Sequence, residues 1–189
     1  MAAVPIRILG LDPGLARMGW GVIDVSGTRL DHVAHGVLTS NAKHDLGARL
    51  HTLHEALCAV IAQLRPASIA VEQAFVAKDP SAALKLGHAR AIALLAAAQA
   101  GLDMAEYAPN HIKKCVVGAG HAGKTQIQMM VRRLLPTARV EAADAADALA
   151  CAIAHAHYAS TRAKIMGALA GEVGAGSPSA RAAKRKALA

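Results

Sequence analysis

Aromatic residues are scarce in this chain of 189 residues, which contains one Trp, one Phe and two Tyr. A hydrophobic core must therefore be built from Leu, Ile, Val and Ala. Long apolar runs are also missing, since no window of eighteen apolar residues occurs, and this argues against a membrane span. The first residues lack the layout of a signal peptide. We therefore expect one globular domain, located in the cytoplasm and not in a membrane.

Cysteine is equally rare, with Cys58, Cys115 and Cys151 as its three occurrences. Their number is odd and none of them forms a CxxC pair, so neither a disulfide framework nor a zinc site is indicated. We expect all three to be small, buried, apolar residues in a reducing compartment.

Acidic residues are outnumbered by basic ones, 13 against 21, and the formal net charge is +8. A basic balance favours a polyanionic partner such as nucleic acid. However, residues 161–189 hold six basic residues and one acidic residue, and a basic tail can also serve solubility alone. This segment is dominated by Gly, Ala and Ser, so we expect residues 1–160 to form the domain and residues 161–189 a disordered basic tail.

The first predicted strand is an apolar run interrupted only by Arg7, and it ends at Asp12, before a Pro-Gly turn. Two further strands complete an antiparallel meander, and an amphipathic helix then leads to a fourth strand. A right-handed crossover through that helix makes the fourth strand parallel to the first, which sets Asp12 beside Glu72. These elements are expected at Ile6–Leu11, Met18–Val25, Leu30–Thr39, Asp45–Leu64 and Ser68–Ala74.

The second half of the chain is predicted to be mainly helical. An alanine-rich helix begins with Asp79 at its cap and is apolar around most of its circumference, so it is buried or packs on a partner chain. The expected elements are helices at 79–101, Pro109–Val117, Lys124–Leu135 and Ala142–Ser160, and a fifth strand at Asp103–Tyr107. Gly19 and Gly21 in the second strand indicate that another part of the chain approaches that strand closely.

Two further acids, Asp144 and Asp147, lie three residues apart on the last predicted helix and therefore share one face. On the residues alone, Asp12 can simply cap its turn, and the helix pair can be a solvated face. If these acids meet Glu72, each pair about 4 Å apart repels by roughly 4 kcal/mol at an effective dielectric constant near 20. Such a group needs cations, and carboxylates suit Mg²⁺ or Mn²⁺, which in pairs catalyse phosphodiester hydrolysis.

The order of strands, helices and acids resembles the ribonuclease-H-like α/β fold, a five-stranded mixed sheet flanked by helices. Six motifs also resemble the RuvC family of Holliday junction resolvases over roughly residues 7–157. They are LGLDPG ending at Gly14, GWGVI from Gly19, VEQAF from Val71, SAALKLGHAR ending at Arg90, VVGAG from Val116 and ADAADALA from Ala143.

The resemblance implies a homodimeric, Mg²⁺-dependent endonuclease that binds a four-way DNA junction and makes paired symmetric nicks during homologous recombination and DNA repair. It also implies cooperation with the RuvA–RuvB branch-migration complex, and an alanine-rich helix at 79–101 near the dimer interface. The metal ligands it implies are Asp12, Glu72, Asp144 and Asp147, while the DNA contacts it implies or favours are Phe75, Lys78, Lys113 and Lys124. Phe75 can instead fill the core, and the lysines can be ordinary solvated side chains.

Two other functions remain to be weighed. Residues 118–125 satisfy the P-loop pattern GxxxxGK[ST], but a P-loop must follow a strand, and residues 115–117 form a poor one. A junction-binding protein without activity explains the positive charge, but not four acids beside a polyanion. Hydrolysis of DNA is therefore the expected function, with Lys124 offsetting charge on the phosphate.

Overall fold

A five-stranded mixed sheet forms the centre of the computed structural model, which describes residues 4–73 and 80–158. The predictions for Phe75, Lys78, the Asp79 cap and the tail at 161–189 lie outside the described residues and stay predictions. The sheet order is β3-β2-β1-β4-β5, with β1 antiparallel to β2 and parallel to β4. The strands are β1 (Ile6–Asp12), β2 (Arg17–Ser26), β3 (Arg29–Thr39), β4 (Ser68–Glu72) and β5 (Asp103–Tyr107).

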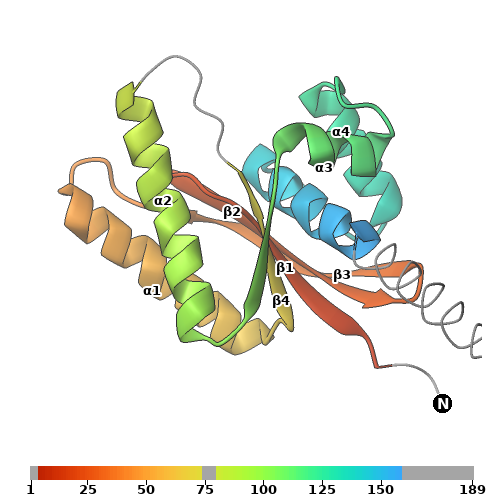
Figure 1. The fold of residues 1–189 in the computed structure, drawn as a ribbon, viewed down its shortest axis with the longest axis horizontal. Helices are drawn as coiled ribbons and strands as arrows, with labels where there is room; N and C mark the ends of the chain where they lie inside the picture. Colours follow the sequence, from red (N-terminus) through yellow and green to blue (C-terminus); the bar gives the residue numbers. More distant parts are fainter. Residues whose placement is uncertain (1–3, 74–79, 159–189) are drawn as a thin grey trace, which may run out of the picture. The chain divides into compact units, whose positions relative to one another are not determined.

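The helices cover both faces of this sheet (Figure 1). On one face, α1 and α2 pack on side chains such as Leu9 and Val71, and on the other, α3, α4 and a helix at residues 143–158 pack on side chains such as Ile8. The labelled helices are α1 (Leu46–Leu64), α2 (Pro80–Gln99), α3 (Pro109–Val117) and α4 (Lys124–Leu134). The predicted ribonuclease-H-like fold is therefore confirmed, with strand β4 ending at Glu72 instead of Ala74.

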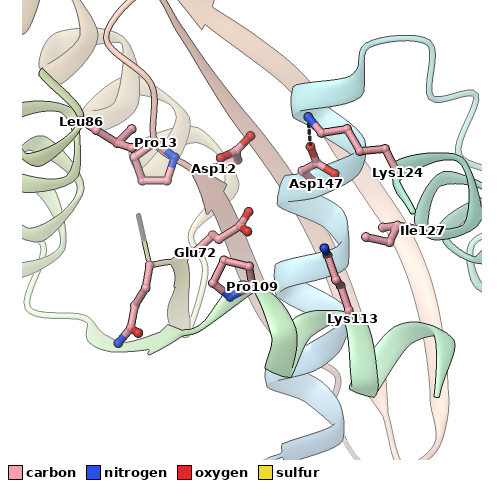
Figure 2. A pocket seen from close by; sticks show the side chains of 10 residues that line it. Asp12, Pro13, Glu72, Leu86, Pro109, Lys113, Lys124, Ile127 and Asp147 are labelled. Atoms are coloured by element: carbon pink, nitrogen blue, oxygen red, sulfur yellow. Dashed lines mark ion pairs between the residues drawn. The ribbon is translucent and has the colours of Figure 1, made fainter. Parts of the chain in front are cut away.

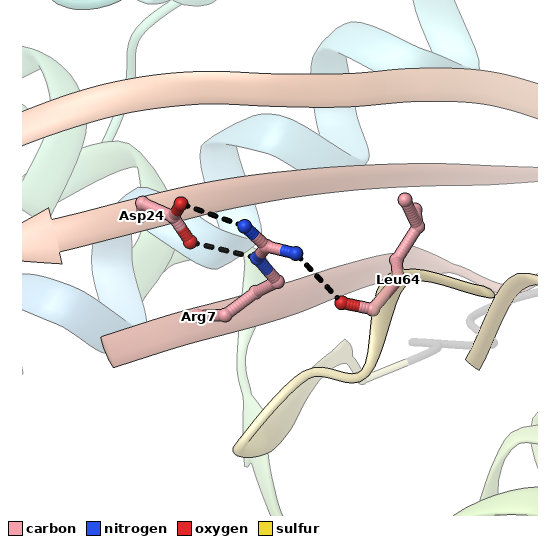
Figure 3. A network of polar contacts seen from close by, with 3 residues as sticks. All are labelled: Arg7, Asp24 and Leu64. Carbon is pink, nitrogen blue, oxygen red and sulfur yellow. Dashed lines mark hydrogen bonds and ion pairs between the residues drawn. The ribbon is translucent and has the colours of Figure 1, made fainter. Parts of the chain in front are cut away.

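The basic residue of β1, Arg7, is paired by β2 and the end of α1 (Figure 3). The Arg7 guanidinium donates two hydrogen bonds to the Asp24 carboxylate, at 2.8 and 2.9 Å, and a third to the Leu64 carbonyl at 2.9 Å. Arg7 thereby joins β1, β2 and the end of α1. The same hydrogen bonds hold the pKa of Asp24 below its usual value.

Three glycines of β1 and β2, namely Gly10, Gly19 and Gly21, form a glycine trough that receives the helix at 143–158. A Cβ atom on Gly19 would lie 2.0 Å from the carbonyl oxygen of Asp144, and one on Gly10 would lie 2.0 Å from that of Ala148. Any side chain at these positions would push the helix away from the sheet. The close approach predicted from Gly19 and Gly21 is confirmed, and this approach fixes the height of the helix above the sheet.

The cysteine prediction is correct in one case out of three. Cys151 is fully buried, but Cys58 and Cys115 are half-buried, and each follows a histidine by one helical turn. Their sulfur atoms lie 3.6 and 3.4 Å from His54 and His111. No disulfide joins Cys58, Cys115 and Cys151. Across the described part of the chain, no helix combines the length and apolar character that crossing a membrane requires.

Candidate active site

Three acids from three different elements line one open cavity of about 330 Å³ at the end of the sheet (Figure 2). Asp12 ends β1, Glu72 ends β4, and Asp147 comes from the helix at 143–158. Lys113 of α3 and Lys124, the first residue of α4, also line the cavity, on the same side as Asp147 (Figure 2). The cavity therefore combines three acidic side chains with two lysines.

The parallel pairing of β1 and β4 explains why two of these acids are neighbours. Leu11 pairs with Val71, so the next residue of each strand, Asp12 and Glu72, emerges at the same edge. The burial of Leu11 and Val71 anchors both strand ends, since neither side chain is exposed. The structure therefore places these two carboxylates where the sequence pattern predicted them.

The two helix acids occupy different positions. Asp147 faces the cavity, whereas Asp144 does not line it and instead accepts a hydrogen bond from Arg17 Nε at 2.7 Å. Asp144 is nevertheless close, because its charge raises the pKa of both Asp12 and Asp147. Of the four acids predicted to meet, three line the cavity and the fourth lies beside them, paired with a cation.

Burial and mutual repulsion make these acids unusually weak. Burial, followed by the charges of Glu72, Asp147 and Asp144, raises the pKa of Asp12 to about 7. Burial and Asp147 likewise raise the pKa of Glu72 to about 7. Burial is also the main cause that raises the pKa of Asp147. Carboxyl groups with these pKa values lack the positive charge that would keep them ionised.

The lysines supply part of that positive charge. Lys124 Nζ lies 3.7 Å from the Asp147 carboxylate, and its charge lowers the pKa of Asp12, Glu72 and Asp147 against the larger effect of burial. Lys113 lowers the pKa of Glu72 and Asp147 in the same way. Lys124 is otherwise open to solvent, with 79% of its side chain exposed. It can therefore reach an anionic ligand at the mouth of the cavity.

The donor set suits a hard divalent cation. All candidate ligands are carboxylate oxygens, which Mg²⁺ and Mn²⁺ prefer. Within the described residues, no three Asp, Glu, His or Cys side chains are already arranged to hold a metal. Two of the four acids already have cationic partners, Lys124 for Asp147 and Arg17 for Asp144.

The sequence did not predict a group of polar residues that joins the helix at 143–158 to the sheet. His155, two turns after Asp147, bonds to Tyr107 Oη through Nδ1 at 2.7 Å and lies 3.2 Å from Ser68 Oγ through Nε2. These contacts connect the helix to β4 and β5. No local sequence pattern links Tyr107 to a histidine 48 positions away.

The P-loop interpretation fails on structural grounds. Residues 115–117 are the end of α3 and not a strand, and Gly118 caps that helix with a positive φ of 83°. The glycine-rich segment thus connects two helices, α3 and α4. A phosphate-binding loop between a strand and a helix is absent from this segment, and Lys124 faces the acids instead.

Comparison with known proteins assigns the chain to a family. The family described as "Crossover junction endodeoxyribonuclease RuvC" matches residues 8–155. This chain belongs to the RuvC family. Proteins of that description from Parvibaculum lavamentivorans and Cereibacter sphaeroides are each 58% identical to it, over 166 and 165 residues. These matches cover 88% and 87% of this chain and 95% and 98% of the relatives.

Solved structures agree with this assignment. A T. thermophilus RuvC in complex with a Holliday junction substrate superposes with a TM-score of 0.78 at 32% identity, covering 82% of this chain and 96% of that one. The yeast mitochondrial Holliday junction resolvase Ydc2 has a TM-score of 0.59 at 11% identity, covering 82% of this chain and 81% of its own. The second match shows a shared fold alone. As a RuvC-family member, this chain is a nuclease of the crossover junction endodeoxyribonuclease class.

Proposed function

We propose that this chain resolves Holliday junctions by hydrolysing one phosphodiester in each of two opposed strands, during homologous recombination and DNA repair. The observation that carries the proposal is the acidic cavity, in which Asp12, Glu72 and Asp147 meet at the end of the sheet in a RuvC-family chain. Acids beside a polyanion are unfavourable unless cations intervene. A site of this kind therefore favours metal-assisted cleavage over simple DNA binding.

The cofactor we propose is Mg²⁺, two ions per site, with Mn²⁺ as a substitute. Asp12, Glu72, Asp144 and Asp147 would be their ligands, and the chemistry supplied is activation of water and stabilisation of the leaving oxygen. Lys124 and Lys113 line the cavity, and their ammonium groups would bind the phosphate. Lys124 would offset the negative charge that develops on the phosphate during the displacement.

We also propose a homodimer, because cutting two opposed strands symmetrically needs two such cavities. The helix α2 is the expected interface: it carries Leu84 and Leu95 with exposed fractions of 66% and 48%. We further propose that the protein acts in the cytoplasm together with the RuvA–RuvB branch-migration complex. Phe75 would stack on DNA bases, which is worth about 1–3 kcal/mol per base, and Lys78 would contact a phosphate.

Incubation with a synthetic four-way junction and with a linear duplex of the same sequence, each with and without Mg²⁺, tests this function. We expect paired nicks in the junction alone, and only with Mg²⁺ or Mn²⁺. Asp12→Asn should abolish cutting and leave junction binding in place, while the matched change Asp31→Asn, at an exposed ion pair with Arg29, should change neither. Equal cleavage of the linear duplex, or metal-independent cutting, would refute the proposal.

A further inference from the structure

Each of the two acids on the helix at 143–158 is paired with a cation that comes from a different element. Lys124 of α4 lies 3.7 Å from Asp147, and Arg17 of β2 lies 2.7 Å from Asp144. The Lys124 pair faces the cavity, whereas the Arg17 pair lies outside its lining. The two carboxylates therefore differ in their surroundings before any metal binds, and the ion pair of Asp144 is the shorter of the two.

The backbone around Arg17 brings it to this position. Arg17 begins β2, directly after the loop that follows Asp12. Two residues later, Gly19 lets the Asp144 backbone approach so closely that a Cβ there would lie 2.0 Å from its carbonyl oxygen. The start of β2 and the start of the helix are thus in contact through backbone atoms, and the guanidinium reaches the carboxylate across this contact.

The Arg17–Asp144 ion pair is accessible to solvent, so another cation can replace the arginine. The Arg17 side chain is 54% exposed and that of Asp144 is 31% exposed, so water and ions reach both. Exposed ion pairs contribute little free energy, so a divalent cation can displace the arginine. Asp144 also acts on the charge state of Asp12, which places it within electrostatic reach of the cavity.

We propose that Arg17 is a resident counter-ion of Asp144, which competes with a divalent cation for this carboxylate and is released when the cation binds. This inference rests on the proposed metal site and makes Arg17 a positioning residue. Without metal, Arg17 offsets the negative charge of Asp144. With metal bound, the Arg17–Asp144 hydrogen bond is broken.

Metal titration of the full-length protein, by calorimetry with Mn²⁺ alone and no DNA, tests the competition. The Arg17→Met variant lacks the competing guanidinium, so it should bind Mn²⁺ about two- to fivefold more tightly than the wild type does. The matched control is Arg29→Met, which removes another exposed arginine that pairs with an aspartate, Asp31, in β3 beside the far end of β2. Arg29→Met should bind Mn²⁺ as the wild type does. Unchanged or weaker binding by Arg17→Met would overturn the inference.

Observation of the arginine Nε–H signals by NMR in the wild type provides a second readout that needs no variant. The Arg17 signal should be protected from exchange in EDTA and lose that protection at saturating Mg²⁺, while the Arg29 signal stays unchanged. Retained protection with Mg²⁺ bound would overturn the inference while leaving the metal site in place. If neither ion binds the wild-type protein at all, the proposed metal site fails, and the inference fails with it.

Discussion

Replacing Asp12 by Asn should stabilise the metal-free protein, which is the opposite of what removing a buried hydrogen-bonding carboxylate usually does. Asp12 is held among three other acids, and burial and their charges raise its pKa to about 7. Above that pH its charge is forced into a site that disfavours it. An amide of the same size removes the charge and keeps the shape, so the repulsion disappears.

The magnitude follows from the pKa. A rise from 3.8 to about 7 corresponds to roughly 4 kcal/mol at full ionisation, because each pKa unit is worth about 1.4 kcal/mol. Glu72, whose pKa is also raised to about 7, takes part in the same repulsion. The side chains around Asp12 can also adjust in the wild type, which lowers the free energy of the repulsion. We therefore expect a gain of about 2–3 kcal/mol at pH 8, or roughly 5–10 °C in Tm for a domain of this size.

The sign of the pH dependence is fixed by the same shift. Because the native state binds the Asp12 proton more tightly than the unfolded chain does, the contribution of Asp12 to stability is fully present below about pH 4 and is lost as pH rises through 7. Asn does not titrate. The difference between Asp12→Asn and the wild type should therefore be small at pH 4 and reach its full value by pH 8.

Chemical denaturation in EDTA at several pH values measures this difference. Asp24→Asn is the matched control with the opposite sign, because hydrogen bonds from Arg7 lower the pKa of Asp24 and its loss should destabilise the protein at pH 8. A lower stability of Asp12→Asn at pH 8, or a gain that does not vary with pH, would refute the picture of clustered, unneutralised acids.

Three further results are expected. Gly19→Ala should cost about 1–3 kcal/mol in denaturation experiments, since its Cβ would meet the helix backbone, whereas Gly87→Ala, with no atom within 4 Å, should be neutral or stabilising. Tyr107→Phe loses the hydrogen bond to His155 and should cost about 1 kcal/mol of unfolding free energy; an unchanged value would mean that the bond contributes nothing. Lys124→Ala should slow junction cleavage about tenfold or more, and ATP titration should show no binding by either protein, while nucleotide binding by the wild type would contradict the assignment of this loop.

The sequence predicted the elements whose ends carry clear local signals. The α3 helix was located at Pro109–Val117, because a proline opens it and Gly118 closes it in the left-handed conformation. The parallel pairing of β1 and β4 followed from the intervening helix, and with it the adjacency of Asp12 and Glu72. Such predictions depend on neighbours in sequence and on the handedness of crossovers, both of which can be read without coordinates.

Other features depend on contacts between distant residues and could not be predicted in this way. Arg17 and Asp144 are separated by 127 positions, so their pairing has no local pattern, and the expectation of four freely converging acids missed it. The exposure of Cys58 and Cys115 depends on which side of each helix meets the core, and composition says nothing about this. The metal-ligand assignments and the DNA contacts stay predictions.

The glycine trough determines how mutations elsewhere affect the acidic cavity. Because backbone atoms of β1 and β2 touch backbone atoms of the helix, the spacing between Asp12 and Asp147 is set by peptide geometry, which does not relax as side chains do. Mutations elsewhere in the hydrophobic layers can alter how firmly the protein folds without shifting that spacing. The glycine trough thus fixes the separation of the two acids through backbone contacts and not through side-chain packing.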